Sequence, residues 1–197
     1  MFDIPTNIVI EDRQFNIRCG GDYRMVLDCF SILNDNDLKK DERIIGCLMI
    51  FYEDFNGPED IFYLDEETIK TLVTEMFKFF NCGQDEKDTK NSPRLINWEK
   101  DEQLVCSAVN KVACQEIRAV KYLHWYTFMG YYMAIGESAL ATVVSIRHKI
   151  VKNKKLEKYE RDFKNENPQY FKWDRKTVEE HEAQDWVLKM WNNGGTK

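Results

Sequence analysis

Residues 65–83 read DEETIKTLVTEMFKFFNCG and carry the clearest structural signal in the chain. Asp65 is a residue type that caps helix N-termini, and the two glutamates after it stand where the helix dipole favours negative charge. The apolar residues that follow recur at the spacing of one helix face; they are Ile69, Leu72, Val73, Met76, Phe77 and Phe80. Gly83 is a typical C-terminal stop. This stretch therefore predicts an amphipathic helix with a wide buried face.

The residues before this helix contain two further apolar stripes with helical spacing. The stripes consist of Val26, Cys29, Phe30 and Leu33, and of Ile45, Leu48, Met49 and Tyr52. Ile44, Cys47 and Phe51 widen the second stripe, so we expect that helix to be the most buried of this half. Short β-branched or aromatic runs at 7–10 and 15–19 predict a small hairpin. The predicted fold is mainly α, a helical bundle with a small N-terminal β-hairpin.

The residues after this helix begin with a polar, charged segment, 84–93, that predicts a linker. The helices expected beyond it are one carrying Leu104, Val105, Ala108, Val109 and Val112, a long stretch from about 119 to 150 that Gly136 bends or breaks, a charged helix over 152–163, and a last helix over 177–191. We expect residues 1–83 and 94–197 to form two helical lobes that pack together as one domain.

Composition narrows the class of protein. Of the 197 residues, 43% are hydrophobic and 13% aromatic, which is enough for a sizeable core, and only 9 Gly and 4 Pro argue against a sandwich of many tight turns. The net charge of −6 does not favour a globally basic nucleic-acid binder. The positive charge is concentrated in residues 147–164, which hold 8 basic and 3 acidic residues. That segment is either a solvated helix face or a surface for a partner.

The sequence offers no catalytic constellation. A hydrolytic triad needs a base beside a nucleophile, and the three histidines (His124, His148 and His181) lie in three different segments. No G-x-S-x-G, P-loop or G-x-G-x-x-G pattern is present. The six cysteines form no C-x-x-C pair, so we expect reduced, buried thiols, no metal and no cofactor. We also expect no export signal and no membrane role, and therefore a cytosolic protein. Because no catalytic constellation is present, we expect that it is not an enzyme.

Two segments have the character of binding surfaces. Aromatic residues at 124–128, with Tyr131 and Tyr132, make their helix apolar on more than one face, which fits a central core helix or one covered by a partner. The same choice applies to the aromatic residues near the C-terminus. The basic run 147–155 can contact phosphates, although it lacks the interleaved aromatic residues of many nucleic-acid surfaces.

Four quoted segments together resemble a known family. They are Asp22-Tyr23-Arg24, Asn97–Asp101 (NWEKD), Leu123–Phe128 (LHWYTF) and Ile146–Ile150 (IRHKI). This pattern is similar to that of the bacteriophage gp-fifteen family, which occurs in tailed phages and prophages of Gram-positive bacteria. The resemblance covers most of residues 5–165, and the aromatic C-terminal extension departs from it.

The resemblance implies a noncatalytic role in phage tail assembly in the host bacterial cytoplasm. Members are typically encoded between the major tail protein and the tape-measure protein, which implies a chaperone that covers the tape-measure protein and recruits tail-tube subunits. The expected partners are therefore these two proteins, together with self-association. Two alternatives stay open, namely a structural tail or connector component of the virion, and a phage regulator that binds nucleic acid through residues 147–155.

On this hypothesis the partner-binding residues are aromatic and basic. An apolar groove, or the core behind it, contains Leu123, Trp125, Phe128 and Tyr132, and contacts with acidic residues of the partner come from Arg147, Lys149 and Lys152. Near the C-terminus the expected contacts are Trp186, Met190 and Trp191. No catalytic residue, metal ligand or cofactor belongs to this hypothesis.

Overall fold

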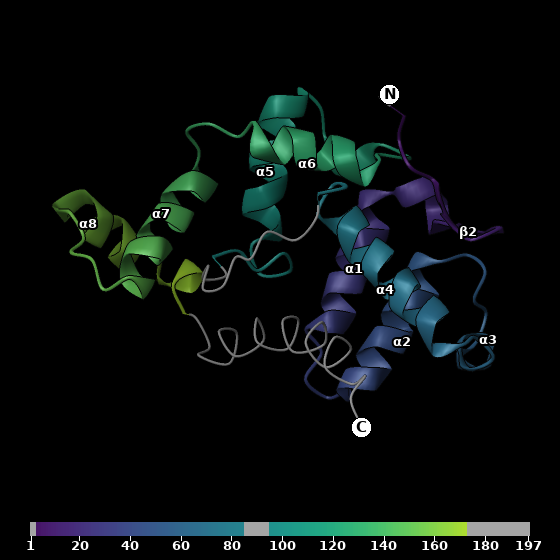
Figure 1. Ribbon diagram of the computed structural model, residues 1–197. Coiled ribbons are helices and arrows are strands. Elements are labelled where there is room, and N and C mark those ends of the chain that lie inside the picture. The colour runs from purple at the N-terminus through teal and green to yellow at the C-terminus, as the bar shows by residue number, and fades with distance from the viewer. Residues whose placement is uncertain (1–2, 85–94, 173–197) are drawn as a thin grey trace. The chain divides into compact units, whose positions relative to one another are not determined.

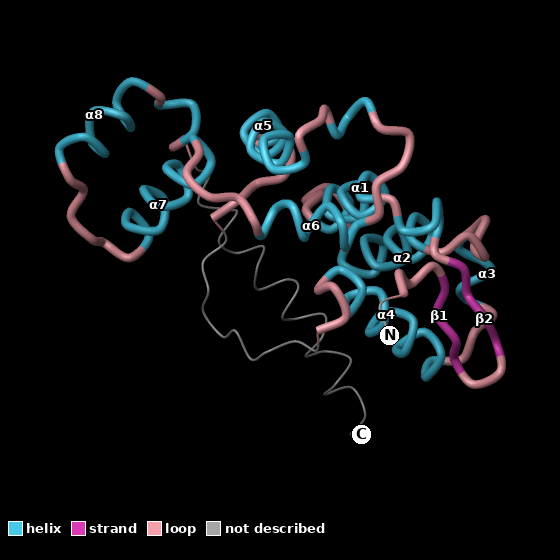
Figure 2. The backbone as a smooth tube through the Cα atoms, turned by 90° about the horizontal axis from the view of Figure 1, so that it is seen from above, coloured by secondary structure: helices cyan, strands magenta, loops and turns pink. Residues whose placement is uncertain are grey.

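The computed structural model describes residues 3–84 and 95–172 (Figures 1 and 2). These residues are mainly α-helical and carry an N-terminal antiparallel hairpin, which confirms the predicted fold class. The elements are β1 (Asn7–Ile10), β2 (Arg13–Asn16), the 3-10 turn η1 (Arg18–Gly21), α1 (Tyr23–Leu33), α2 (Lys40–Phe51), α3 (Pro58–Phe62), α4 (Glu66–Phe80), α5 (Glu102–Ala113), η2 (Ile117–Ala119), α6 (Trp125–Met133), α7 (Ala139–Val151), α8 (Lys158–Glu166) and η3 (Pro168–Tyr170). The predicted linker, apart from Gln84, and the predicted helix over 177–191 lie outside the described residues.

The described chain divides into two compact units. Unit 1 contains residues 3–84 and 121–130, and unit 2 contains residues 95–120 and 131–172. The boundary crosses α6, whose first six residues belong to unit 1. The units therefore do not follow chain order, because the aromatic segment after residue 120 packs with the N-terminal helices.

Unit 1 is a set of helices around an aromatic core. Helix α1 packs on α2, α2 packs on α4, and α4 contacts β1, so the three helices lie side by side (Figure 1). The Phe51 ring meets Phe79 and Phe80 edge-on, at centroid distances of 5.2 and 5.6 Å. Tyr52 is fully buried and donates its hydroxyl hydrogen to the Leu72 carbonyl over 2.8 Å. The core thus satisfies the polar group that it buries.

Helix α4 begins at its predicted cap and ends near Gly83, as predicted, but Cys82 takes part in the C-terminal stop as well. The Asp65 side chain accepts a hydrogen bond from the Thr68 N–H over 2.9 Å, as an N-cap does. At the other end, the Gly83 N–H bonds to the Lys78 carbonyl and the Cys82 N–H to the Phe79 carbonyl. This is a Schellman motif, in which Cys82, with φ +54°, takes the first left-handed position ahead of Gly83.

Unit 2 is built around α5 and α7. Helix α5 packs on α7 and on η2, and α8 contacts η3. The buried apolar side chains of these elements are Leu104, Val105, Cys106, Ala108, Val109, Ile117, Leu140, Val143 and Ile146. They include most of the stripe predicted after residue 100, so the helical period located the core face of this unit as well.

Two predicted helices have other bounds. The stretch expected to be helical from about 119 to 150 is α6 and α7, separated at residues 134–138, and Gly136 lies in that break. Ser138 begins α7 because its hydroxyl accepts the Ala141 N–H over 3.1 Å. The charged helix predicted over 152–163 runs from 158 to 166 instead. Asn153, at φ +50°, ends α7 and opens the connection to α8.

Candidate functional site

The aromatic segment Leu123–Phe128 lies in the core of unit 1. Trp125 is 1% exposed, and its indole N–H donates to the Phe80 carbonyl over 2.9 Å. Phe128 is equally buried and stacks on Tyr23 with the ring centroids 4.6 Å apart. Both rings are used inside the unit, so in the free chain neither offers a face to a partner. Of the two roles left open by the sequence, the structure places these side chains in the core.

A polar junction joins this segment to the start of α1. One Asp22 carboxylate oxygen accepts the Leu123 N–H over 2.9 Å, and the other accepts the Arg24 N–H over 3.0 Å. His124 is buried beside it, with Nε2 3.1 Å from the Pro5 carbonyl and Nδ1 3.0 Å from the Tyr126 nitrogen. A carbonyl only accepts and a backbone N–H only donates, so the ring is the neutral tautomer with hydrogen on Nε2. Burial lowers the pKa of His124, which favours this neutral form.

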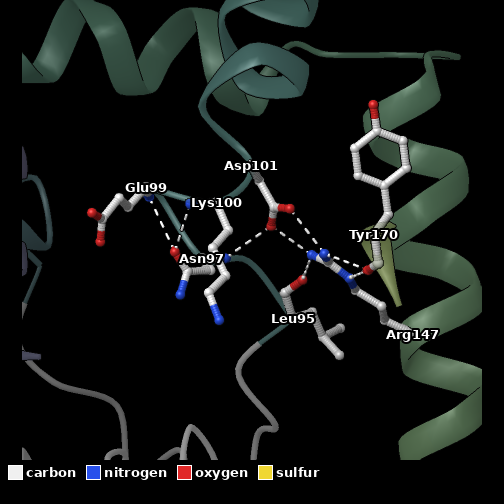
Figure 3. Close-up of polar contacts among 7 residues, drawn as sticks. All are labelled: Leu95, Asn97, Glu99, Lys100, Asp101, Arg147 and Tyr170. Carbon is white, nitrogen blue, oxygen red and sulfur yellow. Dashed lines mark hydrogen bonds and ion pairs between the residues drawn. The ribbon is translucent and has the colours of Figure 1, made fainter. Parts of the chain in front are cut away.

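Arg147 forms the polar centre of unit 2 (Figure 3). Its Nη1 and Nη2 donate to the two carboxylate oxygens of Asp101 over 2.5 and 2.8 Å. The remaining N–H groups bond to the Leu95 carbonyl at 2.9 Å and to the Tyr170 carbonyl at 2.7 and 3.0 Å. All five guanidinium donors are therefore engaged, and the side chain is 6% exposed. The sequence analysis expected Arg147 to contact a partner; in the structure its donors hold three segments of its own unit together.

Lys149 also has an internal partner. Its ammonium nitrogen lies 2.7 and 2.8 Å from the two carboxylate oxygens of the buried Glu160, and this contact joins α7 to α8. The hydrogen bonds between them raise the pKa of Lys149 and lower that of Glu160. Glu160 also accepts the Glu157 N–H over 2.8 Å at the start of α8. Lys149 is therefore part of the packing of α8 on α7.

Most exposed residues of the basic segment lie at the end of α7, at the start of α8 and in the turn between them, which Figure 2 shows as the loop from α7 to α8. Four lysines and three large apolar side chains are solvent-exposed there: Ile150, Val151, Lys152, Lys154, Lys155, Lys158 and Tyr159. We call these seven residues the α7–α8 corner. Charged residues that surround exposed apolar side chains are typical of interaction sites. Lys152 is the one predicted contact residue that the described chain leaves exposed on this surface.

The other predicted contact residues lie elsewhere. Tyr132 is half-buried and packs on Trp98 with the ring centroids 5.2 Å apart, and burial raises its pKa. Trp186, Met190 and Trp191 lie outside the described residues. Sequence reasoning missed Ile150, Val151 and Tyr159 as exposed residues, although an apolar pair directly before a run of lysines was a visible signal.

All six cysteines are free thiols, but Cys19 and Cys114 are exposed, which corrects the expectation that all six are buried. No group of three or more potential metal ligands comes together within residues 3–84 and 95–172. In the same residues, no helix has the length and apolar character needed to cross a membrane.

The chain matches a family of known proteins. The family model described as Bacteriophage Gp15 protein matches residues 3–172. No curated protein and no solved structure matches the chain. The matched range contains both polar centres described above, Asp22 with His124 and Asp101 with Arg147, and it contains the α7–α8 corner.

Proposed function

We propose, from the premise that the chain belongs to the bacteriophage Gp15 family, that it is a noncatalytic chaperone of phage tail assembly. Membership makes it a phage structural or assembly protein in general. The more specific role is to cover the tape-measure protein and to recruit tail-tube subunits in the host cytoplasm. The observation that supports a binding role is the α7–α8 corner, because its exposed charge and apolar surface suit a protein partner.

The physical need for such a chaperone comes from its client. In this proposal the client is the tape-measure protein, a long helix with an apolar stripe. Such a helix aggregates unless another surface covers the stripe. Exposed Val151 and Tyr159 can contact such a stripe, while the four lysines of the corner attract acidic residues beside it. Trp125 and Phe128 are not part of this surface in our proposal, because they lie in the core of the other unit.

The first experiment is a pull-down of the tagged full-length chain from phage-producing cells, together with mass spectrometry of purified virions. We expect the tape-measure protein in the pull-down and none of this chain in virions. Stoichiometric presence in virions would overturn the chaperone role in favour of a structural tail or connector component.

A pair of variants tests whether the corner makes the contact. K154E/K155E reverses two exposed corner lysines, and K121E/K172E reverses two exposed lysines elsewhere with the same change in net charge. We expect the first variant to recover at least about tenfold less tape-measure protein and the second to match the wild type. Equal recovery by all three proteins would exclude the corner as the contact surface.

The same proteins test the nucleic-acid alternative. Contacts between lysine and phosphate bind any duplex and weaken steeply as salt rises. We expect no binding of a random duplex at physiological salt. Salt-sensitive duplex binding that K154E/K155E abolishes would move the assignment to a nucleic-acid-binding regulator.

A further inference from the structure

Unit 1 carries an exposed aromatic pair within a strongly acidic segment. Residues 53–67 hold seven acidic residues and no basic one. Phe62 and Tyr63, at the end of α3, are 67% and 88% exposed, although the neighbouring Ile61 is buried. We call Glu59, Phe62, Tyr63 and Glu67, which are all exposed, the acidic aromatic patch.

Local hydrogen bonds hold the backbone of this patch in place. The Asp60 carboxylate accepts the N–H groups of Asn56 and Gly57 over 2.8 and 3.3 Å, at the start of α3. Asp65 accepts the N–H and the hydroxyl of Thr68 at the start of α4. The aromatic pair lies between these two caps, so little backbone ordering is required when a partner covers it.

The patch complements the α7–α8 corner in both charge and apolar content. The corner has exposed Ile150, Val151 and Tyr159 among four lysines, and the patch has two exposed aromatic rings among acidic residues. Contact between them buries apolar side chains on both sides and brings opposite charges together at the rim. The chain therefore carries two surfaces, one in each unit, that suit each other.

We propose that the α7–α8 corner of one copy of this chain binds the acidic aromatic patch of a second copy. Because the two surfaces differ, two copies make this contact either twice, in a closed two-fold dimer, or once, which leaves a free corner and a free patch to which further copies can add. The proposal does not depend on the chaperone role. If both proposals hold, self-association and tail-protein binding compete for the corner.

Sedimentation velocity of the purified full-length chain in low salt, without tail proteins, tests the proposal. We expect the average mass to rise above 23.5 kDa with increasing concentration. K154E/K155E and E59K/E67K should each raise the dissociation constant of self-association at least about tenfold, while K121E/K172E leaves it unchanged. Circular dichroism checks that each variant is folded.

A mixture of the two reversed variants gives the most specific readout. K154E/K155E keeps the native patch and E59K/E67K keeps the native corner. A copy of one variant can therefore make the native contact with a copy of the other, whereas neither variant can make it alone. We expect the equimolar mixture to form mixed pairs whose dissociation constant is close to that of the wild-type contact. A mixture that stays at 23.5 kDa, or a wild-type chain that stays there at every concentration, would overturn the proposal.

A further variant separates the loss of the contact from destabilisation of α3 and α4. Glu59 and Glu67 lie in the first turns of α3 and α4, where a lysine is unfavourable to the helix dipole. F62S/Y63S keeps these charges and removes the apolar contact. We expect it to weaken self-association as E59K/E67K does, and wild-type association by F62S/Y63S would exclude the patch. These measurements use no tail protein, so their outcome is separate from that of the pull-down.

Discussion

Gly21 shows at the level of a single residue how tightly unit 1 is packed. Its φ of +80° lies in the left-handed region, and an added Cβ would stand 2.8 Å from both His124 Nε2 and Phe79 Cζ. The backbone and the space beside it therefore both require glycine. The adjacent Asp22 and the buried His124 pair as an isolated antiparallel bridge, so this position joins the start of α1 to the segment before α6.

We expect Gly21→Ala to lower the free energy of unfolding by about 3 kcal/mol, about 1 from the left-handed backbone and about 2 from displaced rings. Gly83→Ala is the matched control, because its φ is +78° but its Cβ would lie 3.4 Å from the Tyr126 hydroxyl. That control should lose only about 1 kcal/mol in urea unfolding. Equal losses in the two variants would contradict the steric argument.

His124 predicts a pH dependence of stability. Burial lowers its folded pKa below the ordinary value of 6.5, so below that value the unfolded chain binds a proton that the folded chain excludes. Stability should therefore fall as the pH falls from 6.5 towards the folded pKa. Urea unfolding at several pH values checks this. His124→Gln should lose this part of the slope, and an unchanged slope would assign it to other groups.

We expect replacement of Arg147 to lower the free energy of unfolding strongly, although this residue lies in a lysine-rich segment. Arg147→Ala leaves the buried Asp101 carboxylate without its counter-charge, and we expect a loss of about 3–5 kcal/mol in urea unfolding. Arg147→Lys keeps the charge but offers only three donors, so its loss should be intermediate. Lys152→Ala, at an exposed position five residues further on, should change stability by less than about 0.5 kcal/mol. Similar losses at both positions would contradict the buried role of Arg147.

At the level of elements, α7 and α8 show how a charged contact positions a helix. Helix α8 is polar, and Glu160 is its one residue with a buried side chain. Apolar burial therefore contributes little to holding α8 in place, and the hydrogen bond from Lys149 to Glu160 is the specific contact that positions it. The orientation of α8 sets where Lys158 and Tyr159 lie, so this bond also shapes the α7–α8 corner.

We expect Lys149→Met to loosen α8 without unfolding unit 2. Hydrogen exchange should become faster for amides of α8 and stay unchanged for those of α5. The Glu160 pKa is lowered in the folded chain, so the contact stabilises α8 above the ordinary pKa of 4.5 and is lost as the pH falls through the folded value. The difference between variant and wild type should therefore vanish in acid. Unchanged exchange in α8 at neutral pH would show that other contacts hold it.

At the level of the whole molecule, charge is distributed unevenly along the chain. Residues 1–100 hold 12 basic and 21 acidic residues, whereas residues 101–197 hold 16 and 13. Two exposed surfaces that carry this asymmetry are the acidic aromatic patch in unit 1 and the α7–α8 corner in unit 2. A net charge of −6 alone would suggest repulsion between copies, but association depends on the local surfaces that meet.

This distribution predicts that self-association depends on salt. The Debye length is about 10 Å at 0.1 M salt and about 3 Å at 1 M, so salt screens the rim charges and spares the apolar contact. We expect the dissociation constant of self-association to rise several-fold between 0.05 and 0.5 M NaCl in sedimentation experiments. A constant that salt leaves unchanged would mean that opposite charges do not hold the copies together.

The features predicted correctly from the sequence depend on near neighbours in the chain. Helix α4 was predicted with its Asp65 cap, most of its buried face and its end near Gly83, because capping and helical period involve residues within a few positions. The hairpin and the mainly α class followed from the same local signals. The break between α6 and α7 was visible at Gly136, but the bounds were not.

The roles of the candidate residues depended instead on partners far along the chain. In the sequence, Arg147 and Lys149 looked alike as members of the basic segment. In the structure, Arg147 pairs with Asp101, 46 residues earlier, and Lys149 pairs with Glu160, which lies on a different helix. Trp125 bonds to Phe80, 45 residues earlier. Residue type and spacing revealed which side chains were basic or aromatic. Which of them are buried depends on the path of the folded chain, because burial and pairing arise between segments that no local pattern connects.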